Sequence, residues 1–546
     1  MGAVSAFLLN LPFPIAGPLP VWRSAFAWIA LVPLLLAVLS DENITHPRFL
    51  LRSCAGAYIC GVLWYLLNCY WIYDTMHIYG GIGSVASAGI LLLFSLVLGI
   101  YFGVFGLIVA LFQKAFGRKA IALAAAPIVW AALELAASRI TSVPWDQLGY
   151  SQVDNFLLTR LAPFSGVYGI SLILMAGNAV LAGALLARNP HGRLRVGIGG
   201  VLAIVALQLG SYIPPAPAPA EATAVLLQEN LSVGHDADSD GNQWVGPEWT
   251  SHTNAFIALS KQTCGPYLVG MPEPRPLEVQ PDCSRPPAAD LVAWPEAPAP
   301  FDEKDPRFHT LMKALAEQVH SPVVTGNATV DFIRGVPHLY NAAEFIAPDG
   351  NFLGRYDKIH LVPFGEYVPF KDVFSFAGTL TRGVGGFTPG EYRKVFQSGG
   401  HRFGIFICYE SVFADEVRHF AEMGAQVLVN ISDDGWYGDT SAPWQHLNMA
   451  RMRAIENRRW LIRATNTGVT AAIDPFGRVT QSAPRHVLTS LAVHYGYRDD
   501  TTFYTRYGDV FAAVCAIIAI VGTAYAARRV LHDAYPNLRK SQVPPS

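Results

Sequence analysis

The sequence predicts a multi-pass α-helical membrane domain joined to an external α/β domain. The chain has 546 residues, of which only 15% are charged, and a mean hydropathy of +0.30, which is unusual for a wholly water-soluble protein. Its long apolar stretches lie in the N-terminal part and in one segment near the C-terminus. Between them, short apolar runs alternate with amphipathic segments, as strands and helices do in a layered domain.

The membrane part is predicted from stretch length, because a helix needs about 20 apolar residues to cross a bilayer. Seven stretches satisfy this, near 22–40, 54–73, 82–112, 120–137, 165–187, 195–212 and 509–527. The opening MGAVSAFLLNLPFPIAGPLP is apolar but broken by prolines, so it is either an imperfect eighth span or a remnant of one. It has neither a basic start nor a small-residue cleavage site, so we do not expect a removable signal peptide.

Positive charge predicts the orientation of the spans, because short loops rich in Lys and Arg stay in the cytoplasm. Basic residues fall at every second boundary: Arg48 and Arg52; Lys114, Arg118 and Lys119; Arg188, Arg193 and Arg195; Arg528, Arg529, Arg539 and Lys540. This alternation requires eight spans and places the long region before the last span outside. We therefore expect a membrane domain over 1–212 with about seven helices, the first short. An external domain over 213–508 and a C-terminal membrane helix with a cytoplasmic tail over 509–546 complete the chain.

The external region begins with IPPAPAPAEAT, whose prolines predict a stiff linker. Its buried strands are predicted at TAVLLQEN, DLVAWPE, PVVTGN, HRFGIFICYE and AQVLVNIS, each ending in polar residues. Hairpins are predicted over 341–358 and 468–481, because Pro, Asp and Gly mark a turn between two apolar runs. Helices are expected at about 304–319, 411–423 and 443–460.

Composition argues against two classes of partner. No Lys/Arg-rich block is present, so a nucleic-acid partner is not expected. The seven cysteines form neither CxxC pairs nor a zinc-type spacing, so we expect no metal and no cofactor. Cys264 and Cys283, in a Pro-rich external segment, fit a disulfide or two free thiols equally well. Four others lie in apolar segments and are expected to be small buried hydrophobes: Cys54, Cys60, Cys69 and Cys515.

The seventh cysteine, Cys408, lies at the end of a predicted strand and just before a predicted helix. Such a turn exposes a side chain, and a helix N-terminus favours the thiolate. Backbone N–H groups there, that of Tyr409 first, can hold an oxyanion. When Cys408 is taken alone, a core cysteine at a strand end is the favoured explanation.

Two further motifs strengthen the case for chemistry at Cys408. Glu296, in AWPEAPAP, follows an apolar strand between two prolines; it is either a turn residue or a suitable general base. Lys358, in GRYDKIHLVPFGEYVPF, precedes a proline-marked segment that contains Glu366. A lysine there is ordinarily a solvated charge, but in a dry cleft it would stabilise an anionic intermediate.

In this order, WPE, DKIHLVPFGE and CYES resemble the Glu-Lys-Cys triad of the nitrilase superfamily. The resemblance spans roughly 222–490 and implies an αββα sandwich, in which NISDDGWYG and QHLNMARMRAIENRR match segments that shape the pocket. A nitrilase-like domain before a final membrane helix is similar to the bacterial apolipoprotein N-acyltransferase family. The segments PWDQLGYSQ and PWQHLNMARMRA agree with that family.

The resemblance implies an acyltransferase with Cys408 as nucleophile, Glu296 as general base and Lys358 as the cation that stabilises the tetrahedral intermediate. Glu366 would support this triad, and Glu410 would position Lys358 or Cys408. The implied donor is a phospholipid, whose acyl chain forms a thioester with the cysteine. The implied acceptor is the N-terminal amine of a diacylglyceryl-cysteine apolipoprotein, so the reaction completes lipoprotein maturation. The implied location is the bacterial inner membrane, with the catalytic domain facing the periplasm.

Two tryptophans are expected to cover the site as lids, Trp145 in TSVPWDQLGY and Trp244 in GNQWVGPEW. Anchoring at the membrane interface explains them equally well. A membrane-tethered amidase or nitrile hydrolase would use the same triad but accept water. A transporter is the alternative from another class, supported mainly by Glu134, an ionisable residue within a span.

Overall fold

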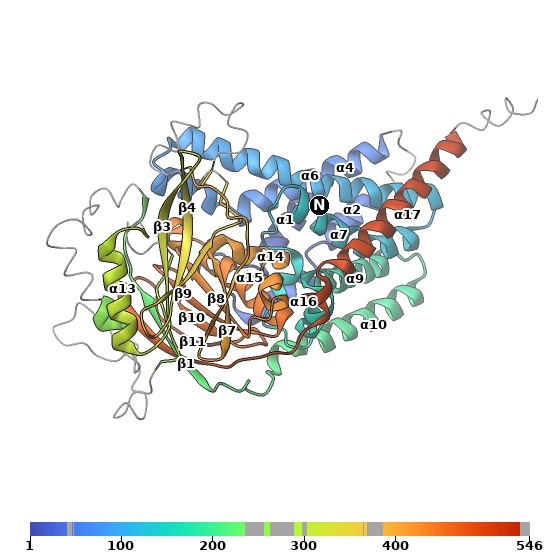
Figure 1. Cartoon of the computed structure of the whole chain (residues 1–546). Helices are drawn as coiled ribbons and strands as arrows, with labels where there is room; N and C mark the ends of the chain where they lie inside the picture. Colours follow the sequence, from blue (N-terminus) through green and yellow to red (C-terminus); the bar gives the residue numbers. More distant parts are fainter. Residues whose placement is uncertain are drawn as a thin grey trace, which may run out of the picture. The chain divides into compact units, whose positions relative to one another are not determined.

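A computed structural model describes residues 1–40, 46, 48–234, 256–261, 289–296, 303–363, 365–367 and 386–534 (Figure 1). The chain forms two compact units. Unit 1 comprises Met1–Tyr70, Gly89–Pro214 and Tyr507–Ser546, and unit 2 comprises Trp71–Ala88 and Pro215–Arg506. The predicted combination of a helical membrane part with an α/β part is confirmed.

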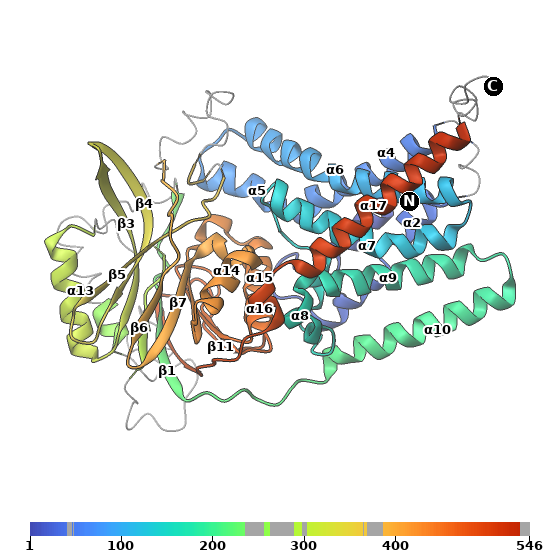
Figure 2. The ribbon, with the colours of Figure 1, turned by 45° about the vertical axis from the view of Figure 1, so that its right-hand side comes forward.

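Unit 1 consists of long apolar helices, of which α7 packs against both α9 and α17 (Figure 2). In the described part of the chain, seven helical segments are long and apolar enough to cross a membrane, so this is a multi-pass membrane protein. These segments are η1 (Val21–Trp28) with α2 (Val32–Val38), α4 (Phe49–Asn68), α6 (Ser84–Phe116), α7 (Lys119–Ile140), α9 (Val167–Leu186), α10 (Pro190–Gln208) with η5 (Leu209–Tyr212), and α17 (Val510–Ala534).

The N-terminal apolar segment forms only a short helix, α1 (Gly2–Asn10). Its nine residues rise about 14 Å at 1.5 Å per residue, whereas the hydrocarbon core of a bilayer is about 30 Å thick. Helix α1 packs against α4 within unit 1. Helix α1 is not among the seven described segments that are long enough to cross a membrane, so the structure does not supply the eighth span that the charge alternation predicts.

The described residues of unit 2 form two six-stranded sheets, ordered β12-β1-β2-β3-β4-β5 and β11-β10-β9-β8-β7-β6. The central strands run parallel and the outer strands antiparallel. The strands are β1 (Ala222–Gln228), β2 (Leu291–Ala293), β3 (Val323–Ile333), β4 (Val336–Ile346), β5 (Phe352–Asp357), β6 (Val395–Ser398), β7 (His401–Ile407), β8 (Val427–Ser432), β9 (Trp460–Thr465), β10 (Ala471–Ile473), β11 (Val479–Ser482) and β12 (Thr489–Tyr495).

The two sheets face each other, and helices cover their outer faces (Figure 2). Between the sheets, Phe345 of β4 stacks on Phe396 of β6 with ring centroids 5.0 Å apart. Helix α13 (Pro306–Val319) packs on the first sheet, and helices α14 (Ala414–Glu422) and α15 (Ala442–Asn457) pack on the second. The layers follow the order helix, sheet, sheet, helix that the resemblance implies.

Local sequence explains most of these elements. Strands β1, β8 and β9 are buried along their whole length, as parallel strands covered on both faces must be. Helix α13 starts where the Asp305 side chain accepts a hydrogen bond from the Arg307 N–H, with a proline at its first position. The five predicted strands, both hairpins and the three predicted helices of this region are all present.

Candidate active site

Cys408 lies directly after β7, where it begins the five-residue turn η8 (Cys408–Val412). Its φ angle is +48°, a left-handed conformation that strains a residue with a side chain. The parallel strands β7, β8 and β9 all end at this edge of the sheet. The strand-to-turn position predicted for Cys408 is therefore correct, although its side chain is buried.

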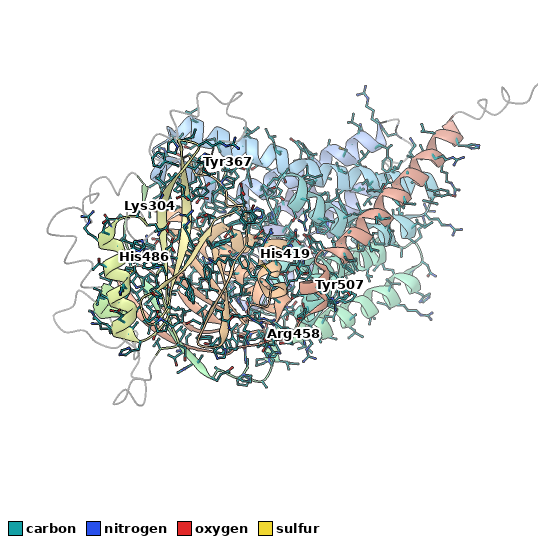
Figure 3. The ribbon with its side chains drawn as sticks, in the orientation of Figure 1. Lys304, Tyr367, His419, Arg458, His486 and Tyr507 are labelled. Carbon is teal, nitrogen blue, oxygen red and sulfur yellow. The ribbon has the colours of Figure 1, made fainter. Side chains whose placement is uncertain are left out.

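The structure brings Glu296, Lys358 and Glu366 together. Glu296 follows β2, and Lys358 follows β5. The Lys358 Nζ atom lies 3.0 Å from Glu296 Oε1 and 2.8 Å from Glu366 Oε1. Lys358 is 1% exposed and Glu296 7% exposed, so the ion pairs are shielded from water. Tyr367, the residue after Glu366, is labelled in Figure 3.

The lysine remains charged despite its burial. Burial alone lowers the pKa of Lys358, but the negative charges of Glu296 and Glu366 outweigh it. Together they hold the pKa well above its ordinary value. The site therefore contains a fixed ammonium group between two carboxylates.

The resting form of Cys408 differs from the expected thiolate. Burial, followed by the charge of Glu296, raises the pKa of Cys408 well above its ordinary value, and Lys358 offsets this only in part. A five-residue turn offers little helix dipole to oppose these effects. Because Glu296 and Lys358 both act on the sulfur electrostatically, the three side chains share one site. Cys408 is a thiol at neutral pH and needs a base.

Glu410 connects the nucleophile's turn to the segment that follows Lys358. One carboxyl oxygen accepts hydrogen bonds from Ile359 N at 2.7 Å, His360 N at 3.2 Å and Tyr356 Oη at 2.7 Å. The other accepts from Ile407 N at 2.7 Å. This places Glu410 where it fixes the backbone beside both functional residues. Burial, followed by the charge of Glu416, raises the pKa of Glu410 to about 7.

The backbone N–H of Tyr409 lies immediately after Cys408 in the same turn, and the Tyr409 side chain is buried. Its ring packs edge-on against Phe413, with centroids 5.2 Å apart. This packing orders the side chain of the residue that follows the nucleophile.

Three polar residues around the cluster were not singled out by the sequence. The Asn341 amide donates to Glu296 Oε1 and to Glu366 Oε1, at 2.7 Å each. The Asp433 N–H donates to Glu296 Oε2 at 2.9 Å. His446 Nε2 lies 3.1 Å from the Cys408 carbonyl oxygen. Asp433 and His446 occur in segments that the resemblance identified as pocket-shaping, whereas Asn341 sits inside a hairpin and gave no signal.

A segment distant in sequence also belongs to unit 2. The short helices α5 (Trp71–Asp74) and η2 (Thr75–Tyr79) pack on η9 (Asp434–Tyr437), and the Trp71 and Tyr437 rings lie 5.2 Å apart. Gly438 leaves room for this segment, because a Cβ atom there would lie 2.4 Å from the Tyr79 hydroxyl. The Tyr437 ring lies 6.0 Å from the ring of His446, whose Nε2 atom is 3.1 Å from the Cys408 carbonyl oxygen, so this wall lies near the nucleophile.

The remaining predicted residues belong to unit 1 or fall outside the described residues. Trp145 is buried in unit 1, at 3% exposure. Trp244, Cys264 and Cys283 lie outside the described residues. Cys54, Cys60, Cys69 and Cys515 are free thiols, and all but Cys54 are buried.

Comparison with known proteins agrees with both parts of the chain. Residues 281–494 match the carbon-nitrogen hydrolase family, and residues 5–180 match the apolipoprotein N-acyltransferase N-terminal domain. Fold and site thus define a multi-pass membrane protein that carries a carbon-nitrogen hydrolase domain. An apolipoprotein N-acyltransferase of Geobacter metallireducens is 33% identical over 97% of this chain and 95% of its own length. One of Pseudomonas putida is 32% identical over 94% of each. The chain belongs to the apolipoprotein N-acyltransferase family.

Among solved structures, Nit3 of Saccharomyces cerevisiae, a nitrilase-superfamily member, aligns with a TM-score of 0.35 and 18% identity. That alignment covers 50% of this chain and 89% of that one. An amidase from Nesterenkonia aligns with a TM-score of 0.34 and 19% identity, over 53% of this chain and 94% of its own.

Proposed function

We propose that this protein transfers a fatty acyl chain from a membrane phospholipid to the N-terminal amine of a diacylglyceryl-cysteine apolipoprotein, through a thioester on Cys408. The observation that carries the proposal is the buried Lys358 ammonium, held between Glu296 and Glu366 beside a buried cysteine thiol. Membership of the family supports the proposed donor and acceptor classes. The geometry supports a role for each side chain in the reaction.

In the first step, a Glu296 oxygen takes the proton from the Cys408 thiol while the sulfur attacks the ester carbonyl carbon of the phospholipid. The C–S bond forms and the carbonyl becomes a tetrahedral oxyanion. When this intermediate collapses, the ester C–O bond breaks. The lysophospholipid oxygen takes the proton from Glu296 and leaves, so the acyl chain remains on the sulfur as a thioester.

Lys358 and the Tyr409 N–H are the groups proposed to stabilise the oxyanion. Lys358 keeps its charge in a buried site, where an electrostatic contact is stronger than in water. Its hydrogen bonds to two carboxylates fix its position before substrate arrives. Little reorganisation is then needed when negative charge develops on the substrate oxygen.

In the second step, the α-amine of the apolipoprotein attacks the thioester carbonyl. Glu296 takes a proton from the amine nitrogen, the C–S bond breaks, and the departing sulfur recovers the proton from Glu296. The product is an amide, and the enzyme returns to its starting state. Water competes with the amine, so a covered site favours transfer over hydrolysis.

The membrane helices suit lipid substrates at both steps. Moving an acyl chain from bilayer to water costs about 0.8 kcal/mol per CH₂ group, so a soluble enzyme would face a large barrier. We further propose that the protein resides in the bacterial inner membrane with unit 2 facing the periplasm. The alternation of basic loops along the sequence supports this orientation.

The covalent step can be tested with membranes that contain the full chain and an alkyne-tagged phospholipid. We expect a label on the protein that hydroxylamine removes, since hydroxylamine cleaves thioesters. Cys408→Ala should abolish the label, whereas Cys515→Ala, which removes a free thiol from α17, should retain it. A label that persists in Cys408→Ala, or no label in the wild-type protein, would overturn the proposal.

A second addition separates the acyltransferase from an amidase. A synthetic diacylated lipopeptide with a free N-terminal amine is added to the labelled protein. The label should move to the peptide as a hydroxylamine-resistant amide. Release of free fatty acid at the same rate with and without peptide would instead identify a hydrolase.

A further inference from the structure

Unit 1 contains a cavity whose lining includes none of the residues given a step in the proposed reaction. Its volume is about 40 Å³. The lining comes from α1, α4, α6 and α7 and from the segment that follows α7. Among the residues that the structure describes, two carboxyl groups line it, Glu134 and Asp146, and no Lys, Arg or His does so.

In each carboxyl group, one oxygen accepts hydrogen bonds from the protein and the other has no hydrogen-bond partner. Glu134 Oε1 accepts hydrogen bonds from Trp130 Nε1 at 2.9 Å and from Leu148 N at 2.8 Å. Asp146 Oδ2 accepts from Asn68 Nδ2 at 2.8 Å. Glu134 Oε2 and Asp146 Oδ1 are buried without a hydrogen-bond partner. A buried acceptor without a donor is costly, so this arrangement favours a ligand that brings donors to both oxygens.

Aromatic rings form much of the remaining wall. Trp130 packs edge-on against Phe102 at 5.2 Å and against Phe105 at 5.1 Å. Trp64 lies 4.6 Å from Tyr65 between ring centroids. Aromatic rings and carboxylates both attract ammonium groups, the rings through their negatively charged faces. The Trp64 Nε1–H is buried without an acceptor, so the ligand should also carry an oxygen.

We propose that this cavity binds a small primary ammonium compound that also carries an oxygen acceptor, of which 2-aminoethanol is the simplest. The ammonium group donates to Glu134 and Asp146 and supplies the positive charge that the lining lacks. The oxygen accepts from Trp64 Nε1. The proposal goes beyond acyl transfer and does not depend on it. A free amine and an ammonium-bearing lipid head group share this chemistry.

The test uses the purified full chain in nanodiscs of phosphatidylglycerol, a lipid without an ammonium group. 2-Aminoethanol hydrochloride is titrated against matched NaCl while tryptophan fluorescence is recorded, because Trp64, Trp130 and Trp145 line the cavity. We expect a saturable change, a weaker one with ethylamine and none with ethylene glycol. An unsaturable change, or an equal change with ethylene glycol, overturns the proposal and indicates water or a neutral solute beside protonated carboxyl groups.

Variants make the test specific to the cavity. Asp146→Asn and Glu134→Gln should each weaken 2-aminoethanol binding at least tenfold, and Trp64→Phe should remove its advantage over ethylamine. Asp154→Asn, which changes a carboxyl group that does not line the cavity, should bind like the wild type. Equal binding by Asp146→Asn and the wild type overturns the proposal. Trp64→Phe keeps an aromatic ring and both carboxyl groups while it removes the Nε1–H donor, so it still tests the proposal if a carboxyl variant fails to fold.

Repeating the titration in nanodiscs that contain phosphatidylethanolamine identifies the source of the ligand. A response suppressed by this lipid indicates that its head group occupies the cavity. A response unchanged by it indicates a free amine. Either result is interpreted only after saturable binding in phosphatidylglycerol has been established.

Discussion

The Nζ atom of Lys358 lies 3.0 Å from Oε1 of Glu296, and both side chains are almost completely buried. Burying an ion pair costs desolvation energy that the mutual attraction often fails to recover. Here a second carboxylate, Glu366, lies 2.8 Å from the same ammonium, which leaves a net negative charge in the cluster. Such an arrangement is a poor way to stabilise a fold. It suits a site in which one carboxylate must accept a proton while the cation stays in place.

Glu296→Gln tests whether Glu296 is the general base that deprotonates Cys408. The amide keeps the shape of the side chain but cannot take the Cys408 proton, and because burial favours the thiol, the sulfur would rarely ionise. We expect hydroxylamine-sensitive labelling to slow about 10²-fold to 10⁴-fold. Glu317→Gln, at a side chain 50% exposed on α13, is the control and should label normally. A normal labelling rate in Glu296→Gln would remove Glu296 from its proposed role.

Lys358→Met should affect stability as well as activity. Without the ammonium, Glu296 and Glu366 face each other in a buried site, and removing one partner of a buried ion pair typically costs about 3–5 kcal/mol. We expect a lower thermal unfolding temperature and loss of labelling.

The control for this variant is Lys394→Met, because Lys394 is near the surface and donates to the Leu353 carbonyl oxygen. It should leave both properties unchanged. If Lys358→Met labels at the wild-type rate, oxyanion stabilisation must come from other groups.

Asp433 predicts a pH dependence of stability. Burial, followed by the charge of Glu296, raises the pKa of Asp433 to about 7. In the unfolded chain an aspartate titrates near 4. The folded state therefore binds the Asp433 proton more tightly than the unfolded chain does. Protonation of Asp433 stabilises the folded state fully below about pH 4, and this stabilisation is lost as the pH rises through about 7.

Asp433→Asn removes this titration while retaining the oxygen that accepts from the Gly435 N–H. We expect the variant to be more stable than the wild type at pH 8, with a smaller difference at pH 5, measured as thermal unfolding temperatures. Asp349→Asn, in an exposed turn, should show no such dependence. A constant difference between Asp433→Asn and the wild type at both pH values would contradict the assignment.

The parts of the site that sequence could predict are those attached to strand ends. Glu296, Lys358 and Cys408 each follow a strand within one or a few residues. The apolar runs that predict these strands therefore also predict that the three side chains lie at sheet edges, where side chains from different strands meet. Asn341 and the Trp71–Ala88 segment reach the site only through tertiary contacts. No local pattern marks such contacts, because the partners lie far apart in the chain.

Strand β9 is an element of the fold that the local sequence pattern did not predict. The sequence predicts one helix over 443–460, but α15 ends at Asn457 and β9 begins at Trp460. The helix is capped by Arg458 in a left-handed conformation, with φ +49°, where a glycine would have signalled the stop. Burial on both faces of the sheet selects the strand, which local propensity alone cannot reveal.

Glu410→Gln tests whether the hydrogen bonds of the Glu410 carboxylate stabilise the turn that contains Cys408. Its two oxygens accept four hydrogen bonds, and a glutamine would turn an N–H donor toward backbone N–H groups. We expect a loss of about 1–3 kcal/mol in stability and slower labelling. Glu422→Gln, at the exposed end of α14, is the control. Unchanged stability and labelling would show that the turn holds its conformation without Glu410.

His446 is predicted to position the nucleophile. Its Nδ1 atom accepts from Arg463 Nη2 at 2.9 Å, so the ring proton is on Nε2, which donates to the Cys408 carbonyl oxygen at 3.1 Å and lies 2.6 Å from Ser411 Oγ. Burial, followed by the charge of Arg463, lowers the pKa of His446, so the ring is neutral at pH 7. A buried ring fixed at both nitrogens can hold Cys408 in its strained conformation, with φ +48°.

His446→Ala should therefore reduce kcat about 10²-fold with little change in KM, because the thiol loses its alignment while the substrate still binds. His446→Gln, which retains a hydrogen-bonding group, should recover part of the loss. His494→Ala, at an exposed position on β12, is the control. A purely structural role would reduce the amount of folded protein and leave the kcat of the folded fraction unchanged. Active-site titration with a thiol reagent distinguishes these outcomes, since it counts the competent enzyme directly.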